Sequence, residues 1–286
     1  MAESPFQVVG IDGSPASAAA LRWAAARTDR YGLIQPVAAW TTPWWATGPS
    51  MAGAVEFPTD AELQARVGAS AATMLAEIDS ALLRKTATMN AAPGPALVGA
   101  AEGATLLVVG SRGHGTVAGA LLGSVSLHCV NHSTTPVAVI PADTFPDEPF
   151  NRIVVGVDGS DHSVAALTWV LETSPKTIAV DVFFVWGFGS PFSEQAILDG
   201  ADVEQRAIDI ARHTVERAKA TAGQADREIW TGTAQGDARE ELRIEATKAD
   251  MIVVGARGRE GLLHLVLGSV ATSLVHSPTT PTVIVR

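Results

Sequence analysis

The chain has 286 residues, which suggests about two domains at roughly 150 residues per domain. Hydrophobic residues make up 47% and charged residues 17%, a composition that excludes an intrinsically disordered chain. Acidic residues outnumber basic residues by 30 to 20 and give a formal net charge of -10, which argues against a nucleic-acid-binding protein.

Short apolar runs alternate with helical patterns along the whole chain. In the first half, the expected strands are residues 6–11, 34–40, 106–109 and 137–140, and the expected helices are residues 16–30, 62–85 and 119–132. In the second half, the expected strands are residues 153–157, 178–186, 228–230, 251–254 and 282–285, and the expected helices are residues 164–172, 203–222, 240–248 and 262–276. Continuous apolar strands separated by helices indicate a parallel sheet covered on both faces. The predicted fold class is therefore α/β, a doubly wound parallel sheet, present twice in tandem.

Sequence motifs recur at a nearly constant offset, so the chain is an internal duplication. VVGIDGS at residues 8–14 recurs as VVGVDGS, LVVGSRG at 107–113 recurs as IVVGARG, and LGSV at 122–125 recurs unchanged, at offsets of 146, 145 and 145. The intervening segment is rich in proline and acidic residues, which is typical of a linker. The predicted division is a first domain at 1–140, a linker at 141–150 and a second domain at 151–286.

The chain shows no sign of secretion or of a disulfide framework. Its one cysteine, Cys129, excludes internal disulfides. The first residues lack the basic and apolar regions of a signal peptide. The two long stretches without charged residues are broken by proline, glycine or histidine, so neither is expected to span a membrane. We therefore expect a cytoplasmic protein.

An aspartate follows the first strand of each copy. Asp12 and Asp158 each precede a Gly-Ser pair at the end of an apolar run. Open parallel sheets bind ligands at the carboxyl ends of their strands, where a carboxylate accepts hydrogen bonds from ribose hydroxyls or an adenine amino group. The alternative interpretation is an aspartate that closes a turn or caps a helix.

Glycines with the same spacing follow a later strand in each copy. The pattern is G-x2-G-x9-G-S, formed by Gly110, Gly113, Gly123 and Ser124 in the first copy and by Gly255, Gly258, Gly268 and Ser269 in the second. Backbone without side chains allows close approach of a phosphate, and helix N–H groups and a serine hydroxyl are anion donors. Repetition in both copies favours phosphate contact over a set of unrelated loop glycines.

The VGIDGS strand end and the G-x2-G-x9-G-S pattern resemble the universal stress protein family, in its tandem form with two domains. The resemblance covers essentially the whole chain and implies an adenine-nucleotide alpha hydrolase-like fold that binds ATP, with or without magnesium. It implies that Asp12 contacts the nucleoside, that Ala39 meets adenine through its backbone, and that Gly110, Gly113, Gly123 and Ser124 hold the triphosphate. The second copy offers Asp158, Val185, Gly255, Gly258, Gly268 and Ser269 for the same roles.

The expected function is a nucleotide-dependent stress-response and regulatory binding module rather than an enzyme. The alternatives are a slow ATP hydrolase or transferase on the same fold, or a protein that binds cyclic AMP or another adenine nucleotide. Arg112 and Arg257 lie inside the glycine loops, either as phosphate contacts or as solvated residues. The copies differ at GDA 236–238, which is AAP 91–93 in the first copy, and in the long connection 41–59 of the first copy, so occupancy of the two sites stays open.

Two further signals compete with this interpretation. GHGTVA at residues 113–118 fits a loose dinucleotide fingerprint, but it follows a late strand and lacks the later acidic residue. His128 and His132 stand four residues apart on an expected helix beside Cys129, a spacing that suits a metal. A solvated or part-buried histidine pair is the favoured interpretation of these residues.

Each copy ends in a short apolar strand. Val137–Ile140 and Val283–Val285 occupy equivalent places, and exposed strands of this kind invite pairing. The family resemblance implies that the two domains form a pseudo-dimer across these strands. A homodimer is expected in addition, with an adenine nucleotide as ligand and no nucleic acid or membrane as partner.

Overall fold

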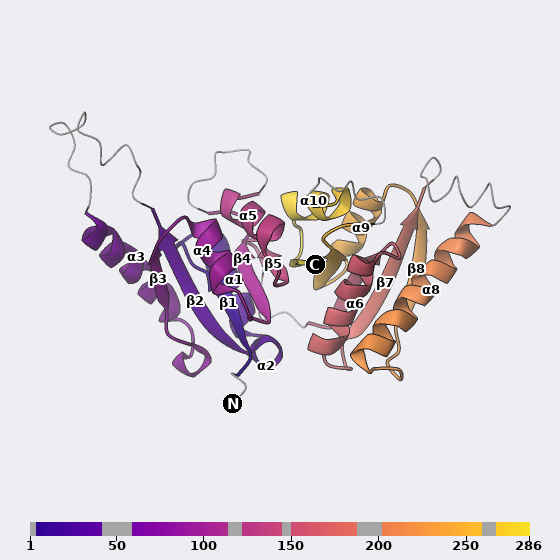
Figure 1. Cartoon of the computed structure of the whole chain (residues 1–286), viewed down its shortest axis with the longest axis horizontal. Helices are drawn as coiled ribbons and strands as arrows, with labels where there is room; N and C mark the ends of the chain where they lie inside the picture. The colour runs from indigo at the N-terminus through magenta and orange to yellow at the C-terminus, as the bar shows by residue number, and fades with distance from the viewer. Residues whose placement is uncertain (1–3, 42–58, 114–121, 145–149, 188–201, 259–266) are drawn as a thin grey trace.

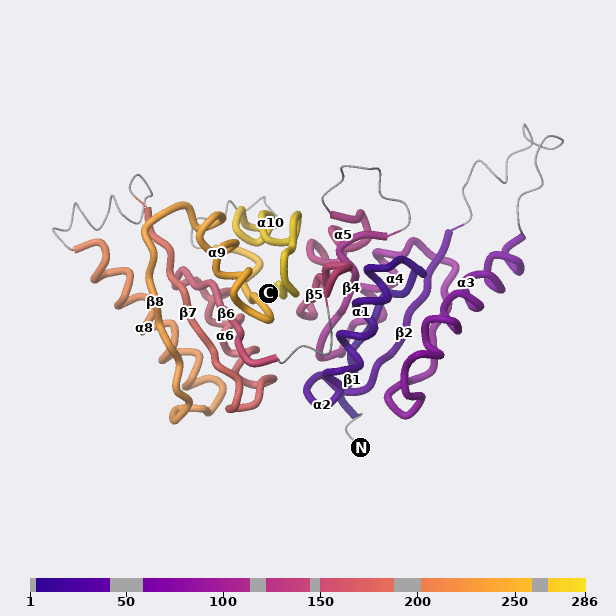
Figure 2. The backbone as a smooth tube through the Cα atoms, turned by 180° about the vertical axis from the view of Figure 1, so that it is seen from behind, coloured from indigo at the N-terminus to yellow at the C-terminus, as the bar shows by residue number. Residues whose placement is uncertain are grey.

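The computed structural model describes residues 4–41, 59–113, 122–144, 150–187, 202–258 and 267–286, which form two α/β halves of one continuous sheet (Figures 1 and 2). The ten strands lie in the order β3-β2-β1-β4-β5-β10-β9-β6-β7-β8. Their bounds are β1 Phe6–Gly10, β2 Leu33–Trp40, β3 Ala87–Asn90, β4 Leu106–Gly110, β5 Val137–Ile140, β6 Arg152–Val157, β7 Ala179–Trp186, β8 Trp230–Gln235, β9 Met251–Gly255 and β10 Thr282–Val285. All pairs are parallel except β5 with β10, and this confirms the predicted tandem parallel-sheet fold.

Helices cover both faces of the sheet. Their bounds are α1 Pro15–Ala25, α2 Thr28–Tyr31, α3 Asp60–Leu75, α4 Pro93–Ala100, α5 Ser124–His132, α6 Asp161–Thr173, α8 Val203–Ala222, α9 Ala238–Ala246 and α10 Ser269–His276. Residues of α1, α6 and α8 pack on one face, and residues of α4, α5, α9 and α10 pack on the other. Within the described ranges, every helix is too short or too polar to cross a lipid bilayer.

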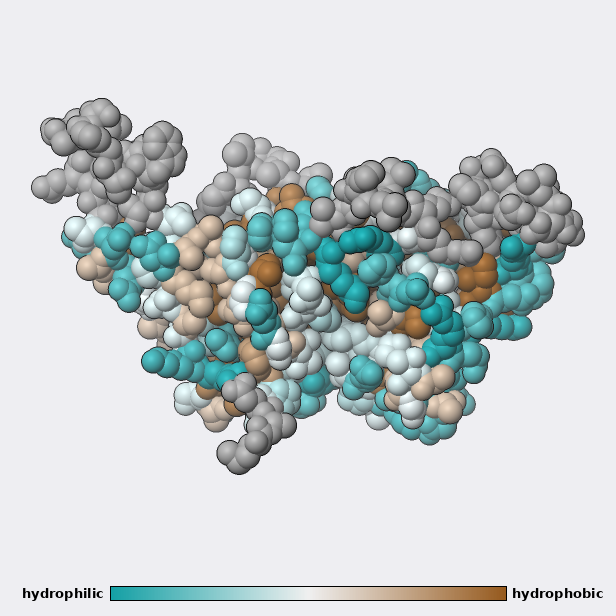
Figure 3. Space-filling view, in the orientation of Figure 1, coloured by the Kyte–Doolittle hydropathy of each residue, from teal (hydrophilic) through white to brown (hydrophobic). Residues whose placement is uncertain are grey.

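Local sequence explains where the long helices begin and end. Thr59 and Glu62 form a reciprocal capping box at the start of α3, with Thr59 N donating to Glu62 Oε2 at 2.7 Å. Asp202 Oδ1 accepts from Gln205 N at the start of α8, and Gly223 takes a left-handed conformation (φ 64°) at its end. Alanines line the buried face of α8, while its outer surface is hydrophilic (Figure 3).

Several predicted boundaries are wrong. The helix expected at 16–30 ends at Ala25, because Arg27 leaves helical conformation (φ -134°) and donates from Nη1 to Trp23 O at 2.9 Å. The helix expected at 62–85 ends at Leu75 and is followed by a short 3-10 helix at Ser80–Leu82. Strand β3 and helix α4 were not predicted at all, because β3 is a four-residue edge strand with only every second residue half-buried.

The second half also departs from the expected bounds. Strand β8 spans Trp230–Gln235 rather than residues 228–230. The sequence pattern did not extend this strand past Trp230 because it contains Gly232, an unusual residue for a strand; the exposed Trp230 ring lies over this glycine. Residues 145–149 of the predicted linker and residues 42–58 of the long first-copy connection lie outside the described residues.

The two halves join through antiparallel pairing of β5 with β10. Val139 faces Thr282 and Val137 faces Ile284 across this junction, and all four are buried. The predicted association of the two domains through their last strands is thus confirmed. Because β5 and β10 pair with each other, neither strand remains an exposed sheet edge.

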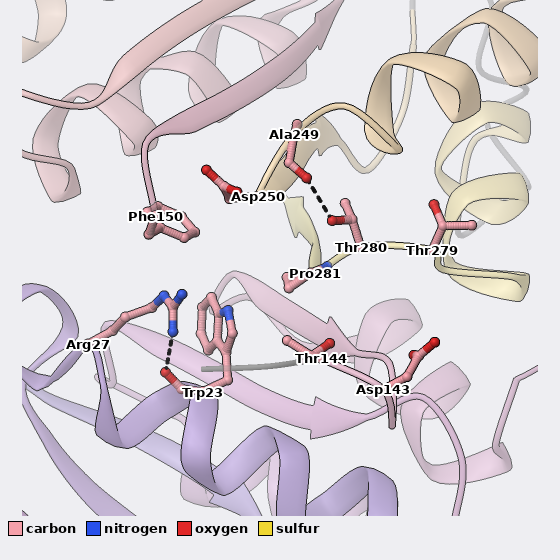
Figure 4. Close-up of a pocket in the computed structure, with 10 residues that line it drawn as sticks. All are labelled: Trp23, Arg27, Asp143, Thr144, Phe150, Ala249, Asp250, Thr279, Thr280 and Pro281. Carbon is pink, nitrogen blue, oxygen red and sulfur yellow. Dashed lines mark hydrogen bonds between the residues drawn. The ribbon is translucent and has the colours of Figure 1, made fainter. Parts of the chain in front are cut away.

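Aromatic side chains cross the junction on the α1 and α6 face of the sheet. Tyr31 stacks between Trp23 of its own domain, with ring centroids 5.9 Å apart, and Trp169 of the other, at 5.7 Å. Arg27 lies 4.5 Å from the ring centroids of both Trp23 and Phe150. Trp23, Arg27 and Phe150 line a cavity of about 140 Å³ between the domains, drawn in Figure 4, which is also lined by Asp250.

Candidate functional site

A tight turn holds Asp12 at the carboxyl end of β1. Asp12 Oδ1 accepts from Ser14 N at 2.9 Å, and Gly13 between them has φ 86°, which favours glycine. Ser14 Oγ in turn accepts from Ser17 N at 3.1 Å and caps α1. Asp12 therefore closes the turn with one oxygen, the serine supplies the helix cap, and Asp12 Oδ2 is left to face the glycine loop.

The second copy builds the same turn around Asp158. Asp158 Oδ1 accepts from Ser160 N at 3.0 Å and from Ser160 Oγ at 2.6 Å, and Gly159 has φ 83°. Ser160 Oγ accepts from Ser163 N at 3.2 Å and caps α6. The two copies share this geometry because they share the Asp-Gly-Ser sequence.

The aspartate turn and the glycine loop meet in both copies. Ser14 Oγ donates to Arg112 O at 3.2 Å, and Ser160 Oγ, whose proton goes to Asp158 Oδ1, lies 3.4 Å from Arg257 O. A Cβ placed on Gly258 would lie 2.5 Å from Asp158 Oδ2, and one placed on Gly113 would strike Asp12 Oδ2 in the same way. The structure thus brings together residues that the sequence separates by about a hundred positions.

The first glycine of each loop has a separate reason to lack a side chain. A Cβ at Gly110 would lie 2.6 Å from the carbonyl carbon of Ala16, and one at Gly255 would lie 2.7 Å from that of His162. The ends of β4 and β9 therefore pack directly against the first turn of α1 and α6. Close packing of strand on helix is sufficient to require glycine at these two positions, whatever ligand binds nearby.

The later Gly-Ser pair stands at a helix start rather than inside a helix. The expected helices 119–132 and 262–276 begin at Ser124 and Ser269, with Gly123 and Gly268 as N-caps. Residues 114–121 and 259–266 lie outside the described part of the chain, and so does most of the GHGTVA fingerprint. Backbone N–H groups in the first turn of α5 and α10 have no partner within the helix pattern, and an anion is favoured at such a helix start.

Gly123 and Gly268 pack at ordinary contact distances against the described residues around them. Their N–H groups donate to Ser111 O at 2.9 Å and to Ala256 O at 2.8 Å, which fixes the base of each loop. A Cβ on either glycine would meet protein atoms no closer than 3.5 Å, an ordinary contact distance. Contacts with the described residues therefore do not require glycine at these two positions, in contrast to Gly110 and Gly255.

Ala39 and Val185 lie near the carboxyl ends of the neighbouring strands. Ala39 pairs with Met89 on β2 and Val185 pairs with Ala234 on β7, and both are half-buried. Strand β2 runs beside β1, and β7 runs beside β6, so each residue stands on the strand next to the aspartate of its copy. This placement agrees with the backbone role that the resemblance implies for them.

The two copies differ in how the helix after the outermost strand begins, which is α9 in the second copy and α4 in the first. Asp237 caps α9 through Arg239 N at 2.8 Å, and hydrogen bonds from Arg239 lower the pKa of Asp237 to about 2. In the first copy, α4 begins at Pro93 after Ala92, which supplies no side-chain cap.

A cationic cluster beside the second glycine loop was not predicted. His162 of α6 lies at Gly255, and its electrostatic neighbours include Arg257, Arg286, Asp158 and Asp161. Arg286 Nη2 donates to Val130 O at 3.0 Å and to Asn131 O at 2.5 Å, at the last turn of α5 in the other domain. A position-by-position comparison of the two copies would have shown the signal, because Ala16 and Pro141 stand in the places of His162 and Arg286.

The histidine pair is held by its own helix. The rings of His128 and His132 stack with centroids 4.1 Å apart, and His132 Nδ1 lies 2.9 Å from His128 O. Cys129 between them is fully buried. Among the described residues, no group of three histidine, cysteine or acidic side chains is arranged to hold a metal ion. The groove of Figure 4 is separate as well, because none of the predicted nucleotide-site residues lines it.

Comparison with known proteins gives consistent matches over both halves. The profile of the universal stress protein family matches residues 8–141 and 149–286. Universal stress protein Rv1996 of Mycobacterium tuberculosis is 30% identical over 302 residues, covering 98% of this chain and 94% of the relative. A universal stress protein of Mycolicibacterium smegmatis is 29% identical over 301 residues, covering 98% and 96%.

Solved structures show the same fold at lower identity. A universal stress protein from Archaeoglobus fulgidus superimposes with a TM-score of 0.63 at 17% identity, covering 98% of this chain and 96% of that one. A putative universal stress protein from Pseudomonas aeruginosa gives a TM-score of 0.60 at 15% identity, covering 99% and 93%. Both cover the tandem arrangement, not one domain alone.

Proposed function

Because the chain belongs to the universal stress protein family, we propose that it is a regulatory module that binds an adenine nucleotide, ATP, in each of its two domains. One observation carries the proposal: in both copies a strand-end carboxylate oxygen and a loop glycine lie in contact, beside the start of a helix. A carboxylate suits a ribose or adenine donor, and the glycine and helix backbone suit phosphates. Asp12 and Asp158 would hold the nucleoside.

The glycine loops would hold the phosphates. Gly123 and Gly268 suit this role because each caps the start of a helix and Ser124 and Ser269 are exposed next to them. Gly113 and Gly258 allow the backbone to approach the carboxylate closely. Magnesium, where it accompanies ATP, would be carried by the phosphates. These contacts stabilise the bound triphosphate in its ground state and in a transition state for hydrolysis alike, and such uniform binding does not lower the chemical barrier.

We therefore propose that the nucleotide is held rather than rapidly turned over. Arg112 and Arg257 bring charge to the loops, but charge alone does not position a water molecule for attack. Turnover should be well below the roughly 1–10³ per second typical of enzymes. ATP consumption with magnesium in that typical range, abolished by Asp12→Ala/Asp158→Ala, would instead make the protein a hydrolase or transferase.

The first experiment identifies the nucleotide that the purified protein carries. Acid denaturation should release an adenine nucleotide, and chromatography with mass detection distinguishes ATP from cyclic AMP and other adenine compounds. Cyclic AMP as the released compound would replace ATP in the proposal. A protein that releases no nucleotide and binds none in calorimetry would contradict the nucleotide-binding function altogether.

The second experiment separates the two sites. Asp12→Asn and Asp158→Asn keep an oxygen for the turn but remove the charge, and each should weaken ATP at one site by about tenfold, since a charge-assisted hydrogen bond is worth about 1.5–3 kcal/mol. Gly123→Val and Gly268→Val should weaken the same sites through their phosphates. Calorimetry gives the stoichiometry and affinity of each variant, and unchanged values in all four would overturn the assignment.

Cytoplasmic location and a homodimer stay predictions, checked by fractionation and by sedimentation.

A further inference from the structure

The second copy has basic side chains at two positions where the first copy has uncharged residues. His162, Arg257 and Arg286 correspond in the duplication to Ala16, Arg112 and Pro141. The structure confirms the correspondence, because Ala16 contacts the position of Gly110 as His162 contacts that of Gly255. Likewise, Ser111 N bonds to Ile140 O and Ala256 N to Val285 O, the residues just before Pro141 and Arg286. Two of the three positions therefore differ in charge between otherwise matching sites.

Geometry places the cluster at the glycine loop. The Cβ atom of His162 lies 2.8 Å from the place that a Cβ would take on Gly255. Arg257 is half-buried, and its Nε atom is buried without a hydrogen-bond partner in the described part of the chain. Arg112, its counterpart, is exposed. Arg286 is fixed by the two carbonyls of α5, so it adds charge to the cluster from a held position.

The three basic groups disfavour the charged forms of one another. Burial lowers the pKa of His162 below its ordinary value, and Arg257 and Arg286 lower it further, against the opposing effect of Asp158 and Asp161. Burial also lowers the pKa of Arg286, and Arg257 adds to that shift. Gathering cations beside a loop costs free energy, and a bound polyanion would relieve this cost.

We propose that the second site selects nucleotides by phosphate charge, binding a polyphosphate chain in preference to a single phosphate, and that His162, Arg257 and Arg286 are the residues that set this preference. The proposal rests on the nucleotide binding proposed above and deepens it for one of the two sites. The first site, with Ala16 and Pro141 in place of two of these residues, discriminates less.

A pH dependence follows for the same site. A phosphate beside His162 favours the protonated imidazole, so binding takes up a proton there. ATP affinity at the second site should therefore rise as the pH falls through the range in which His162 titrates. Because ATP itself titrates in this range, the pH dependence of ATP affinity is compared between the wild-type chain and His162→Ala, and the difference reports on His162. Asp158 and Asp161 favour the protonated imidazole, and Arg257 and Arg286 oppose it in both states.

The test compares ATP with AMP at each site by calorimetry. Gly123→Val should weaken the first site, so that binding reports mainly on the second site. Gly268→Val should weaken the second site, so that binding reports mainly on the first. We expect the ratio of ATP to AMP affinity to be about tenfold higher at the second site, the equivalent of one charge-assisted contact. His162→Ala in the Gly123→Val chain should lower ATP affinity and this ratio and leave AMP nearly unchanged. His162→Gln, which keeps a polar side chain without charge, should behave like His162→Ala.

His213→Ala, at an exposed position on α8, is the matched control and should change neither affinity nor pH profile. Thermal unfolding of each variant shows whether the fold is kept. Equal ATP to AMP ratios at the two sites, or a pH profile unchanged by His162→Ala, would overturn the charge selection while leaving nucleotide binding intact. A wild-type chain that binds no ATP would overturn both proposals together.

Discussion

Tyr31 of the first domain and Trp169 of the second stack with ring centroids 5.7 Å apart and ring planes 5° from parallel. Tyr31 is 1% exposed, so the stack is part of the core that spans the two domains. The antiparallel pairing of β5 with β10 adds backbone hydrogen bonds to the same junction. The domains are therefore expected to unfold together, in one transition, rather than as two independent units.

The coupling between the two rings is measurable. Tyr31→Leu and Trp169→Leu should each lower the free energy of unfolding. The double variant should lose less of this free energy than the two single losses added together. The expected interaction energy is about 0.5–1.5 kcal/mol, the range for aromatic pairs. Urea unfolding of the four proteins of this cycle gives the value. Strictly additive losses would mean that the stack contributes nothing beyond the burial of each ring.

Tyr31 should titrate far above an ordinary tyrosine. Burial raises its pKa to about 12, and it is the single tyrosine of the chain, so phenolate absorbance reports on it alone. Because its pKa is raised in the folded state, Tyr31 contributes stability that is fully present below pH 10. This contribution is lost as the pH rises from 10 toward 12. The loss amounts to about 3 kcal/mol at most, and Tyr31→Phe should remove it. A native phenolate titration near pH 10 would contradict the burial.

Cys129 should be inert while the protein is folded. Burial raises the pKa of its thiol to about 12, and the side chain is 0% exposed. Thiolate is the reactive form, so an aromatic disulfide reagent at pH 8 should leave the native chain unmodified. The denatured chain, as the control, should react with one equivalent. Rapid stoichiometric reaction of the native protein would show that α5 opens readily.

Charge in the strand junction should disrupt the domain arrangement. Val139 and Ile284 are both buried, at most 2% exposed, on β5 and β10. Val139→Asp or Ile284→Asp would bury an unpaired carboxylate, at a cost of about 3 kcal/mol or more. Thermal unfolding should show the loss, and X-ray scattering should show a changed separation of the domains. A surface change, Ala72→Asp, serves as the control, since Ala72 is exposed on α3. Unchanged scattering and stability in both buried variants would contradict the role of this junction.

The glycines of one loop should divide into two kinds. Gly255→Ala should lower stability by about 1–3 kcal/mol, because a Cβ there would lie 2.7 Å from the His162 carbonyl carbon. Gly268→Ala should change stability by less than about 1 kcal/mol, since a Cβ there has ordinary contacts and only the helix N-cap preference is affected. Chemical denaturation compares the pair. Equal losses in both would mean that the loop packs differently from the structure.

The sequence pattern predicted the duplication and the tandem α/β fold, and the family resemblance implied the pairing of the last strands. Apolar runs such as VVGI and LLVV determine buried parallel strands because hydrophobic burial depends on local pattern. The repeated Asp-Gly-Ser turn is local as well, since glycine alone takes the required φ easily and the aspartate bonds two residues ahead. The prediction that the aspartate and the glycines share one site rested on the rule that parallel sheets bind ligands at the carboxyl ends of their strands, together with the family resemblance.

Only the tertiary structure decided the relationships between distant residues. Periodicity does not state that Val139 faces Thr282, or that Tyr31 stacks on Trp169, because register and cross-domain contact depend on the path of the whole chain. It also missed β3 and α4, a short half-buried edge strand and a helix of small residues with little amphipathic pattern. Arg286 shows the limit most clearly. Its place in the sequence is the last position, yet folding carries it to the end of α5 and to the side of His162, where long-range packing and charge, not local sequence, set its role.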